Sequence, residues 1–106
     1  DIKNKKNVEK IFKKNQFDIV FNLAAQAGVR YSIDNPAAFV DNNILGFYNI
    51  LDASIKFKVK KLLYASSSSV YGDSKSFPLK ENHIVTYCQQ YFLKLKFLLI
   101  YQLILK

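Results

Sequence analysis

Four consecutive serines, Ser66–Ser69, are the side chains of this 106-residue chain whose type and placement best suit chemistry. They follow the apolar run Leu62–Ala65, which comes directly after two lysines. An apolar run of this length predicts a strand buried on both faces of a parallel sheet. The serines then fall at the carboxyl end of that strand, the edge at which open α/β sheets bind ligands. Four serines also suit an ordinary polar loop, so composition alone leaves both interpretations open.

Other reactive side chains are few. His83 is the only histidine, and no carboxylate is placed beside it by spacing, so a surface histidine is favoured over a general acid or base. With one histidine the sequence offers no metal-ligand spacing. The single cysteine, Cys88, cannot form an internal disulfide and fits a reducing compartment.

Composition and charge indicate a globular, cytoplasmic protein. Half of the residues are hydrophobic, which disfavours disorder. The net charge is +8, but the lysines are scattered and Arg30 is the only arginine, so we expect a solvated surface and no nucleic-acid partner. No apolar run follows the basic residues at the start, and the uncharged run 97–105 has nine residues where a membrane span needs about twenty. We therefore expect no signal peptide and no membrane partner.

The elements that must position the serines alternate between helix and strand. Apolar residues at helical spacing among lysines predict a short amphipathic helix closed by Asn15: Val8, Ile11 and Phe12. The β-branched and aromatic run 17–23 predicts a buried strand. The small residues of 24–28 follow it, and they allow either close approach of a ligand to the backbone or tight helix–strand packing.

A longer helix is predicted between the two strands. Asp34-Asn35-Pro36 is a helix-start signal, and apolar residues then recur at intervals of three and four until about Phe57. Asn42, Asn43 and Gly46 are poor helix formers inside it, so the paired asparagines either face solvent or hold something with their side chains. The resulting order of helix, strand, helix and strand predicts a βαβ crossover with two parallel strands.

Three motifs in order resemble the extended short-chain dehydrogenase/reductase family: residues 18–32, 43–46 and 65–72. The nearest branch is that of the NAD-dependent nucleotide-sugar epimerases and dehydratases, and Ala24–Ser32 (AAQAGVRYS) is most similar to UDP-glucuronate 4-epimerases. The resemblance covers about residues 1–85. It implies an α/β fold, a partial Rossmann-like parallel sheet with flanking helices that lacks the first βαβ unit and the substrate domain. It also implies an NAD cofactor, a UDP-sugar substrate and a homodimeric full-length enzyme.

The resemblance assigns roles to single residues. Asp1 and Ile2 match the pair that contacts the adenine of NAD. Asn43 matches a helical asparagine that steadies the site, and the cofactor is lined by Leu23, Ala24, Ala25, Gln26 and Ser66. Ser67 matches the catalytic hydroxyl, with Ser68 beside it facing the substrate. Arg30 either faces a carboxylate or phosphate of the substrate or is a surface arginine.

In the family's chemistry a tyrosinate takes the proton of the sugar C4 hydroxyl while NAD takes the hydride. A hydroxyl at the Ser67 position hydrogen-bonds that oxygen, and the hydride returns to the other face of the 4-keto sugar. The expected reaction is interconversion of UDP-glucuronate and UDP-galacturonate for surface polysaccharide synthesis.

Two departures from the family pattern lead us to expect that the chain alone is inactive. The glycine-rich loop that cradles the pyrophosphate is absent from the sequence. The resemblance also places a Tyr-x-x-x-Lys pair after Val85. This pair is missing there, since Tyr87 is followed four residues on by Tyr91, and Tyr91 by Leu95. A non-catalytic fragment, a subunit completed by another chain and a sugar-nucleotide dehydratase therefore remain alternatives to the epimerase.

Residues 86–106 are expected to be an atypical apolar tail that follows the partial NAD(P)-binding domain of residues 1–85. Residues 89–106 consist only of Gln, Tyr, Phe, Leu, Lys and Ile, without a helical or alternating period. This composition predicts a slip of the reading frame at about codon 85. One of the other two reading frames is then expected to encode the missing Tyr-x-x-x-Lys pair from about codon 85. If neither frame encodes it, the tail is a genuine, differently evolved segment.

Overall fold

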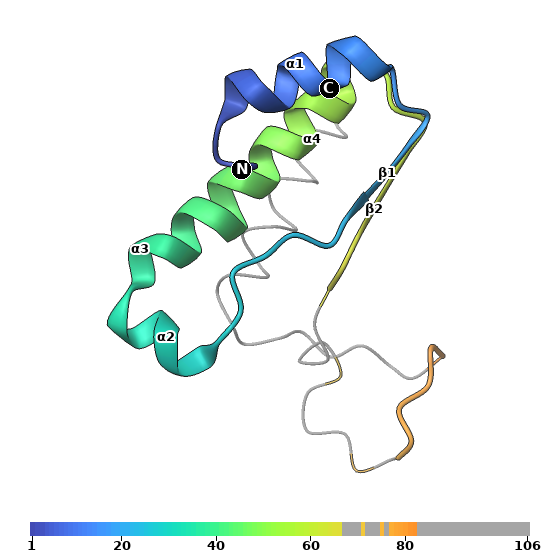
Figure 1. Cartoon of the computed structure of the whole chain (residues 1–106). Coiled ribbons are helices and arrows are strands. Elements are labelled where there is room, and N and C mark those ends of the chain that lie inside the picture. Colours follow the sequence, from blue (N-terminus) through green and yellow to red (C-terminus); the bar gives the residue numbers. More distant parts are fainter. Residues whose placement is uncertain (67–70, 72–74, 76, 83–106) are drawn as a thin grey trace. The chain divides into compact units, whose positions relative to one another are not determined.

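The computed structural model describes residues 1–66, 71, 75 and 77–82, and the chain divides into two units after Ala65. All helices and strands that it describes lie in the first unit (Figure 1). Their order is α1 Lys5–Asn15, β1 Ile19–Asn22, α2 Val29–Asp34, α3 Pro36–Phe39, the π-helical segment η1 Val40–Gly46, α4 Phe47–Lys56 and β2 Lys61–Tyr64. Among these helices none has the length and apolar character that crossing a bilayer requires.

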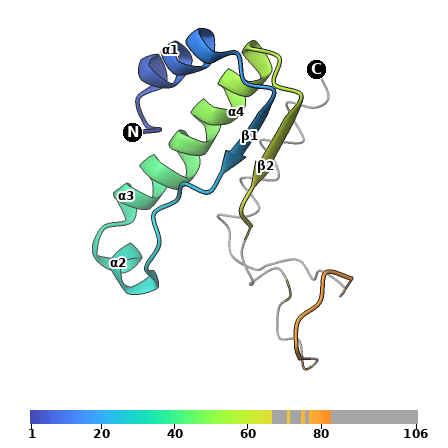
Figure 2. The ribbon, with the colours of Figure 1, turned by 45° about the vertical axis from the view of Figure 1, so that its right-hand side comes forward.

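The two strands confirm the predicted parallel crossover. β1 and β2 pair in parallel, with register from Ile19↔Lys61 to Asn22↔Tyr64 (Figure 2). The helices α2 to α4 form the connection between them. This arrangement is the predicted α/β class, a partial Rossmann-like parallel sheet with flanking helices.

The first helix forms where the apolar spacing predicts it. The side-chain oxygen of Asn4 caps its start by accepting from the Asn7 N–H at 3.1 Å. The helix ends where Gln16 adopts a left-handed conformation, with φ of 49°, and donates its N–H to the Phe12 carbonyl at 3.0 Å. Val8 and Phe12 are buried. One face of α1 is therefore fixed against the rest of the unit.

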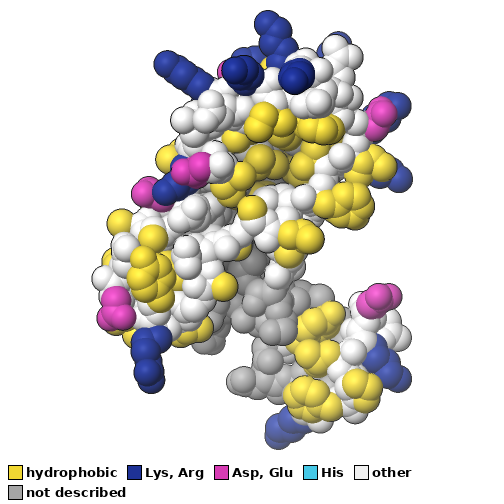
Figure 3. Space-filling model, in the orientation of Figure 1, with side chains coloured by type: hydrophobic (Ala, Val, Ile, Leu, Met, Phe, Trp, Pro, Cys, Tyr) yellow, Lys and Arg dark blue, Asp and Glu magenta, His cyan; other side chains and the backbone are white. Residues whose placement is uncertain are grey.

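The core lies between α1, α4 and one face of the sheet. Its buried residues are Val8, Phe12, Ile50 and Ala53, and half-buried residues pack against them: Ile2, Val20, Phe57, Val59 and Leu62. The Phe12 ring meets Phe17 edge-on, with centroids 5.5 Å apart. In Figure 3 a band of hydrophobic side chains lies below the lysine-rich edge of the molecule.

Ion pairs at the rim join the same two helices. Lys5 of α1 lies 2.9 Å from the Asp52 carboxylate of α4, and Lys56 of α4 lies 3.1 Å from Glu9. The hydrogen bond to Asp52 raises the pKa of Lys5 above its ordinary value. The lysines of both pairs are exposed and the carboxylates half-buried. Such rim pairs stabilise little, so burial of the apolar faces rather than charge holds α1 on α4.

The other face of the sheet differs from the prediction. The strand before the serines was expected to be buried on both faces and the run 17–23 to be a buried strand, but Ile19, Phe21 and Leu63 are 49%, 68% and 45% exposed. Val20 and Leu62, at the alternate positions, pack against the core. The prediction is wrong for the described residues because α1 and α4 both cover the same face.

The long predicted helix begins as expected and then changes its hydrogen-bonding pattern. Asn35 caps α3, with its side-chain oxygen 3.3 Å from the Ala38 N–H, and Pro36 takes the first helical position. The chain then passes through η1 before α4 continues to Lys56. Within η1 the Asn42 side chain donates to the Ala38 carbonyl at 2.7 Å.

Candidate functional site

The loop that follows β1 is shaped by Asn22. This residue is 7% exposed, its backbone carbonyl accepts from the Ala65 N–H at 3.1 Å, and its side-chain oxygen accepts from the Ala24 N–H at 3.2 Å. The first bond ties together the carboxyl ends of the two strands. The second turns the chain away from the sheet immediately after β1. The start of the loop and the end of β2 thus lie at the same edge of the sheet, and the serine run follows β2 in the sequence.

Asn43 of η1 binds both polar groups of one loop residue. Its side-chain oxygen accepts from the Gln26 N–H at 2.7 Å, and its side-chain nitrogen donates to the Gln26 carbonyl at 3.0 Å. A planar amide that makes two bonds to one residue's main chain fixes the orientation as well as the position of that residue. The alternative left open by the paired asparagines is thereby decided, because the side chains of Asn42 and Asn43 both hold backbone groups.

The surface of this loop favours one of the two interpretations of its small residues. Leu23, Ala24, Ala25 and Ala27 are all exposed. They therefore do not form a tight packing contact within the described residues. An exposed backbone with short side chains, held from behind by Asn43, is suited to close approach by a flat or extended ligand.

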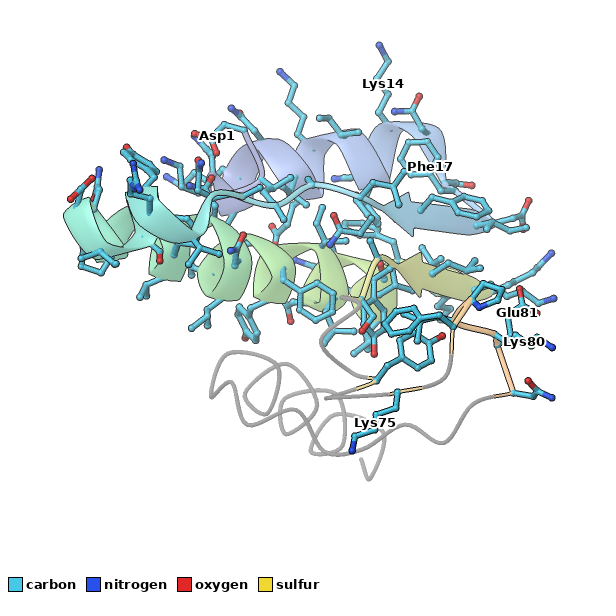
Figure 4. All side chains as sticks on the ribbon, turned by 90° about the horizontal axis from the view of Figure 1, so that it is seen from below. Asp1, Lys14, Phe17, Lys75, Lys80 and Glu81 are labelled. Carbon is cyan, nitrogen blue, oxygen red and sulfur yellow. The ribbon has the colours of Figure 1, made fainter. Side chains whose placement is uncertain are left out.

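The first residues of the chain are held on α4 as well. The Asn49 side-chain nitrogen donates to the carbonyls of Ile2 and Lys3, at 2.9 and 3.0 Å. The Asp1 side chain accepts from the Lys3 N–H at 2.9 Å and remains exposed. Figure 4 shows Asp1 at the N-terminal end of α1, at the opposite end of that helix from Phe17.

The remaining predicted residues are placed only in part. Ser66 is exposed, two residues beyond the last residue of β2, whereas Ser67 and Ser68 lie outside the described residues. Arg30 is exposed at the second position of α2, which is compatible with both of its interpretations. The tail predicted for 86–106 also falls outside the described residues.

A groove of about 560 Å³ runs along α1, lined in part by Val8, Phe12 and Ile50. It includes Asp1 and Ile2 but neither Asn43 nor any residue of the loop 23–28. We therefore assign the candidate site to the edge of the sheet and the loop, not to this groove.

Sequence reasoning gave no role to two asparagines that hold backbone groups near these segments, Asn22 and Asn49. The only available signal was an asparagine, Asn49, six residues beyond Asn43 within the periodic helix. Its hydrogen-bond partners lie 46 and 47 residues away in the chain, so no local pattern indicates them.

The comparisons with known proteins identify the family of this chain. The chain belongs to the GDP-mannose 4,6 dehydratase family, whose model matches residues 1–91. This match confirms the predicted resemblance to NAD-dependent epimerases and dehydratases of the short-chain dehydrogenase/reductase type.

Individual relatives and solved structures are similar to this chain over most of its length. Protein CapI of Staphylococcus aureus is 53% identical over 77 residues, which is 73% of this chain and 23% of CapI. A probable UDP-glucuronate 4-epimerase of Rhizobium meliloti is 45% identical over 64 residues, 60% of this chain and 19% of that protein. The UDP-glucose 4-epimerase of Thermus thermophilus, in complex with NAD, is 27% identical with a TM-score of 0.76, covering 99% of this chain and 34% of that chain. The chain thus spans about a quarter of the length of the curated relatives it matches.

Proposed function

We propose that this chain forms part of the NAD-binding domain of a nucleotide-sugar epimerase or dehydratase. The observation that carries the proposal is the pair of hydrogen bonds from Asn43 to Gln26, which hold an exposed small-residue loop at the carboxyl edge of a parallel sheet. That edge is where doubly wound sheets bind dinucleotides. The NAD complex of the Thermus thermophilus epimerase supports the choice of cofactor.

The residues present fit this cofactor. Leu23, Ala24 and Ala25 are exposed and offer apolar contact without bulk, as a nicotinamide or ribose surface requires. Asp1 keeps an exposed carboxylate, with its side chain 59% accessible, which suits a hydrogen bond to the adenosine half. When bound, NAD would supply the hydride acceptor of the reaction. The chain's own contribution would be to hold the loop, through Asn43, at a fixed distance from the sheet.

For the reaction itself we propose C4 epimerisation of UDP-glucuronate through a 4-keto sugar. The identity to the Rhizobium meliloti protein and the 43% identity over 82 residues to UDP-glucuronate 4-epimerase 4 of Arabidopsis thaliana support it. Ser67 would hydrogen-bond the C4 oxygen as its proton leaves, with Ser66 on the cofactor side and Ser68 on the substrate side. Arg30 would pair with the sugar carboxylate. We extend the proposal to a role in surface polysaccharide synthesis, in a cytoplasmic homodimer.

A dehydratase acting on a sugar nucleotide is the second candidate, favoured by the description of the matching family. Both reactions begin with oxidation at C4, so they differ in later steps and not in the residues discussed above. A non-catalytic subunit is the third candidate, favoured by the lack of a Tyr-x-x-x-Lys pair in the segment that follows Val85.

A chimera tests the proposal directly. Residues 1–82 of this chain replace the matching segment of the Thermus thermophilus epimerase, and NAD binding is measured by calorimetry beside the unaltered host. We expect the folded chimera to bind NAD and to epimerise UDP-glucose, because its substrate domain is that of the host. Ser67→Ala in the chimera is expected to lower kcat by about 10²-fold, with Ser69→Ala as the matched control. A folded chimera without NAD binding would contradict the cofactor assignment, and binding without turnover would favour the non-catalytic subunit.

A further inference from the structure

Asn49 is a buried amide directed at the segment Asp1–Lys3. It lies on α4 and is 2% exposed, and its side-chain nitrogen donates to two consecutive carbonyls, those of Ile2 and Lys3. A side-chain amide nitrogen carries two hydrogens, so this group is fully used. An apolar side chain of similar size would fill the same space but leave both carbonyls without their donor. The amide is therefore specific for the backbone of this segment.

Gly46 provides the room for Ile2. A Cβ atom at this position would lie 2.7 Å from both Cγ1 and Cδ1 of Ile2, which is closer than van der Waals contact allows. The backbone of Gly46 is ordinary helix, with φ of −61°, so glycine is not required there for its conformational freedom. What the position requires is the absence of a side chain, because Ile2 lies directly against the helix.

The continuous helical run from Val40 to Lys56 therefore holds two segments that are far apart in sequence. Asn43 binds the loop at Gln26, and three and six residues further on Gly46 and Asn49 seat Ile2. A helix is stiff over this length, so it fixes the position of one segment relative to the other.

We propose that Gly46 and Asn49 are positioning residues that set the adenylate end of the dinucleotide site by fixing Asp1 and Ile2 relative to the loop 23–26. The proposal rests on the proposed function, which gives Asp1 and Ile2 the adenosine half of NAD. The ligand whose binding these residues would affect is an adenosine phosphate. Binding of the sugar nucleotide would not depend on them.

The experiment uses the natural full-length polypeptide, freed of NAD, and compares binding of ADP with binding of UDP by calorimetry. Gly46→Ala pushes Ile2 off the helix, and Asn49→Asp removes both donors while keeping the shape. Each is expected to weaken ADP binding by about tenfold or more and to leave UDP binding unchanged. Ser54→Ala is the matched control, because Ser54 is a buried polar residue of α4 whose hydroxyl donates only to Ile50 within the helix. Its ADP affinity is expected to stay at the wild-type value.

Hydrogen exchange supplies a readout independent of ligands. Both variants are expected to speed amide exchange in residues 3–4 while the Gln26 amide keeps its protection. If Asn49→Asp fails to fold, Gly46→Ala, which adds one methyl group, carries the test. Equal loss of ADP and UDP binding, or unchanged ADP binding in folded variants, would overturn the proposal. A wild-type protein that binds neither NAD nor ADP would instead show that the proposed function itself is wrong.

Discussion

Truncation of Phe47 to alanine is expected to destabilise the protein by about 3–5 kcal/mol, the usual cost of removing a large buried aromatic side chain. Phe47 is the first residue of α4, is 1% exposed, and meets the Tyr64 ring at the end of β2 with centroids 5.3 Å apart. It therefore joins the helix to the strand that leads into the serines. Since a small domain is stable by only about 5–15 kcal/mol, this loss is a large fraction of the total free energy of unfolding.

The measurement is the free energy of unfolding from urea titrations followed by far-ultraviolet circular dichroism. Phe21→Ala is the matched control, because it removes the same side chain from a position that is 68% exposed on the outer face of β1. We expect its cost in the 106-residue chain to stay below about 1 kcal/mol, as for most surface substitutions. Equal losses in the two variants would show that Phe47 does not join α4 to β2.

Much of the fold was predictable from the sequence because its signals are local. The spacing of Val8 and Phe12 gives α1, and Asn35-Pro36 gives the start of α3, since a cap and a fixed φ act within one turn. The parallel pairing of β1 and β2 followed from a single rule on crossover connections. The two helix signals are thus decided by residues that are neighbours in the chain, whereas the strand pairing follows from the order of the elements.

The elements that were missed depend on tertiary contacts or lack a periodic signal. The helix α2 exposes Val29 and Ile33, at 83% and 78%, so its apolar residues form no buried stripe that a periodicity could reveal. The π-helical segment η1 coincides with the asparagines whose side chains bind backbone groups, which no propensity scale describes. The open outer face of the sheet was missed because an apolar strand does not reveal which of its faces a helix covers.

The residues of the candidate site also divide into those that the sequence indicated and those that it did not. The resemblance gave Asn43 the role of steadying the site, and in the structure its side chain makes two hydrogen bonds to the backbone of Gln26. It did not indicate Asn49, because the partners of that residue are main-chain carbonyls, which every sequence contains. The role of a helix residue that binds main-chain groups is therefore apparent only from the folded structure.

Asn43→Ala is expected to impair catalysis strongly. Loss of the side chain leaves the Gln26 N–H and carbonyl without their partners, so the loop 23–26 loses its fixed distance from the sheet. In the natural full-length polypeptide we expect kcat to fall by about 10²-fold, since a displacement of about 1 Å near a bound cofactor has effects of that size. Steady-state kinetics with UDP-glucuronate give kcat and KM, and calorimetry gives the affinity for NAD.

The control for Asn43 is its neighbour. Asn42→Ala removes the same side chain from the same π-helical segment, but Asn42 donates to the Ala38 carbonyl and touches no predicted site segment, so its kcat is expected to stay near the wild-type value. Amide hydrogen exchange separates positioning from general loss of structure: the Gln26 N–H, protected by its 2.7 Å bond, is expected to exchange rapidly in Asn43→Ala and slowly in Asn42→Ala.

Asn43→Asp refines the assignment, because it keeps an acceptor for the Gln26 N–H but sets a second oxygen against the Gln26 carbonyl, where the wild-type donor lies at 3.0 Å. If that variant protects the Gln26 amide yet loses as much activity as alanine, the carbonyl bond determines the position of the loop; full activity in the alanine variant would remove Asn43 from the site altogether.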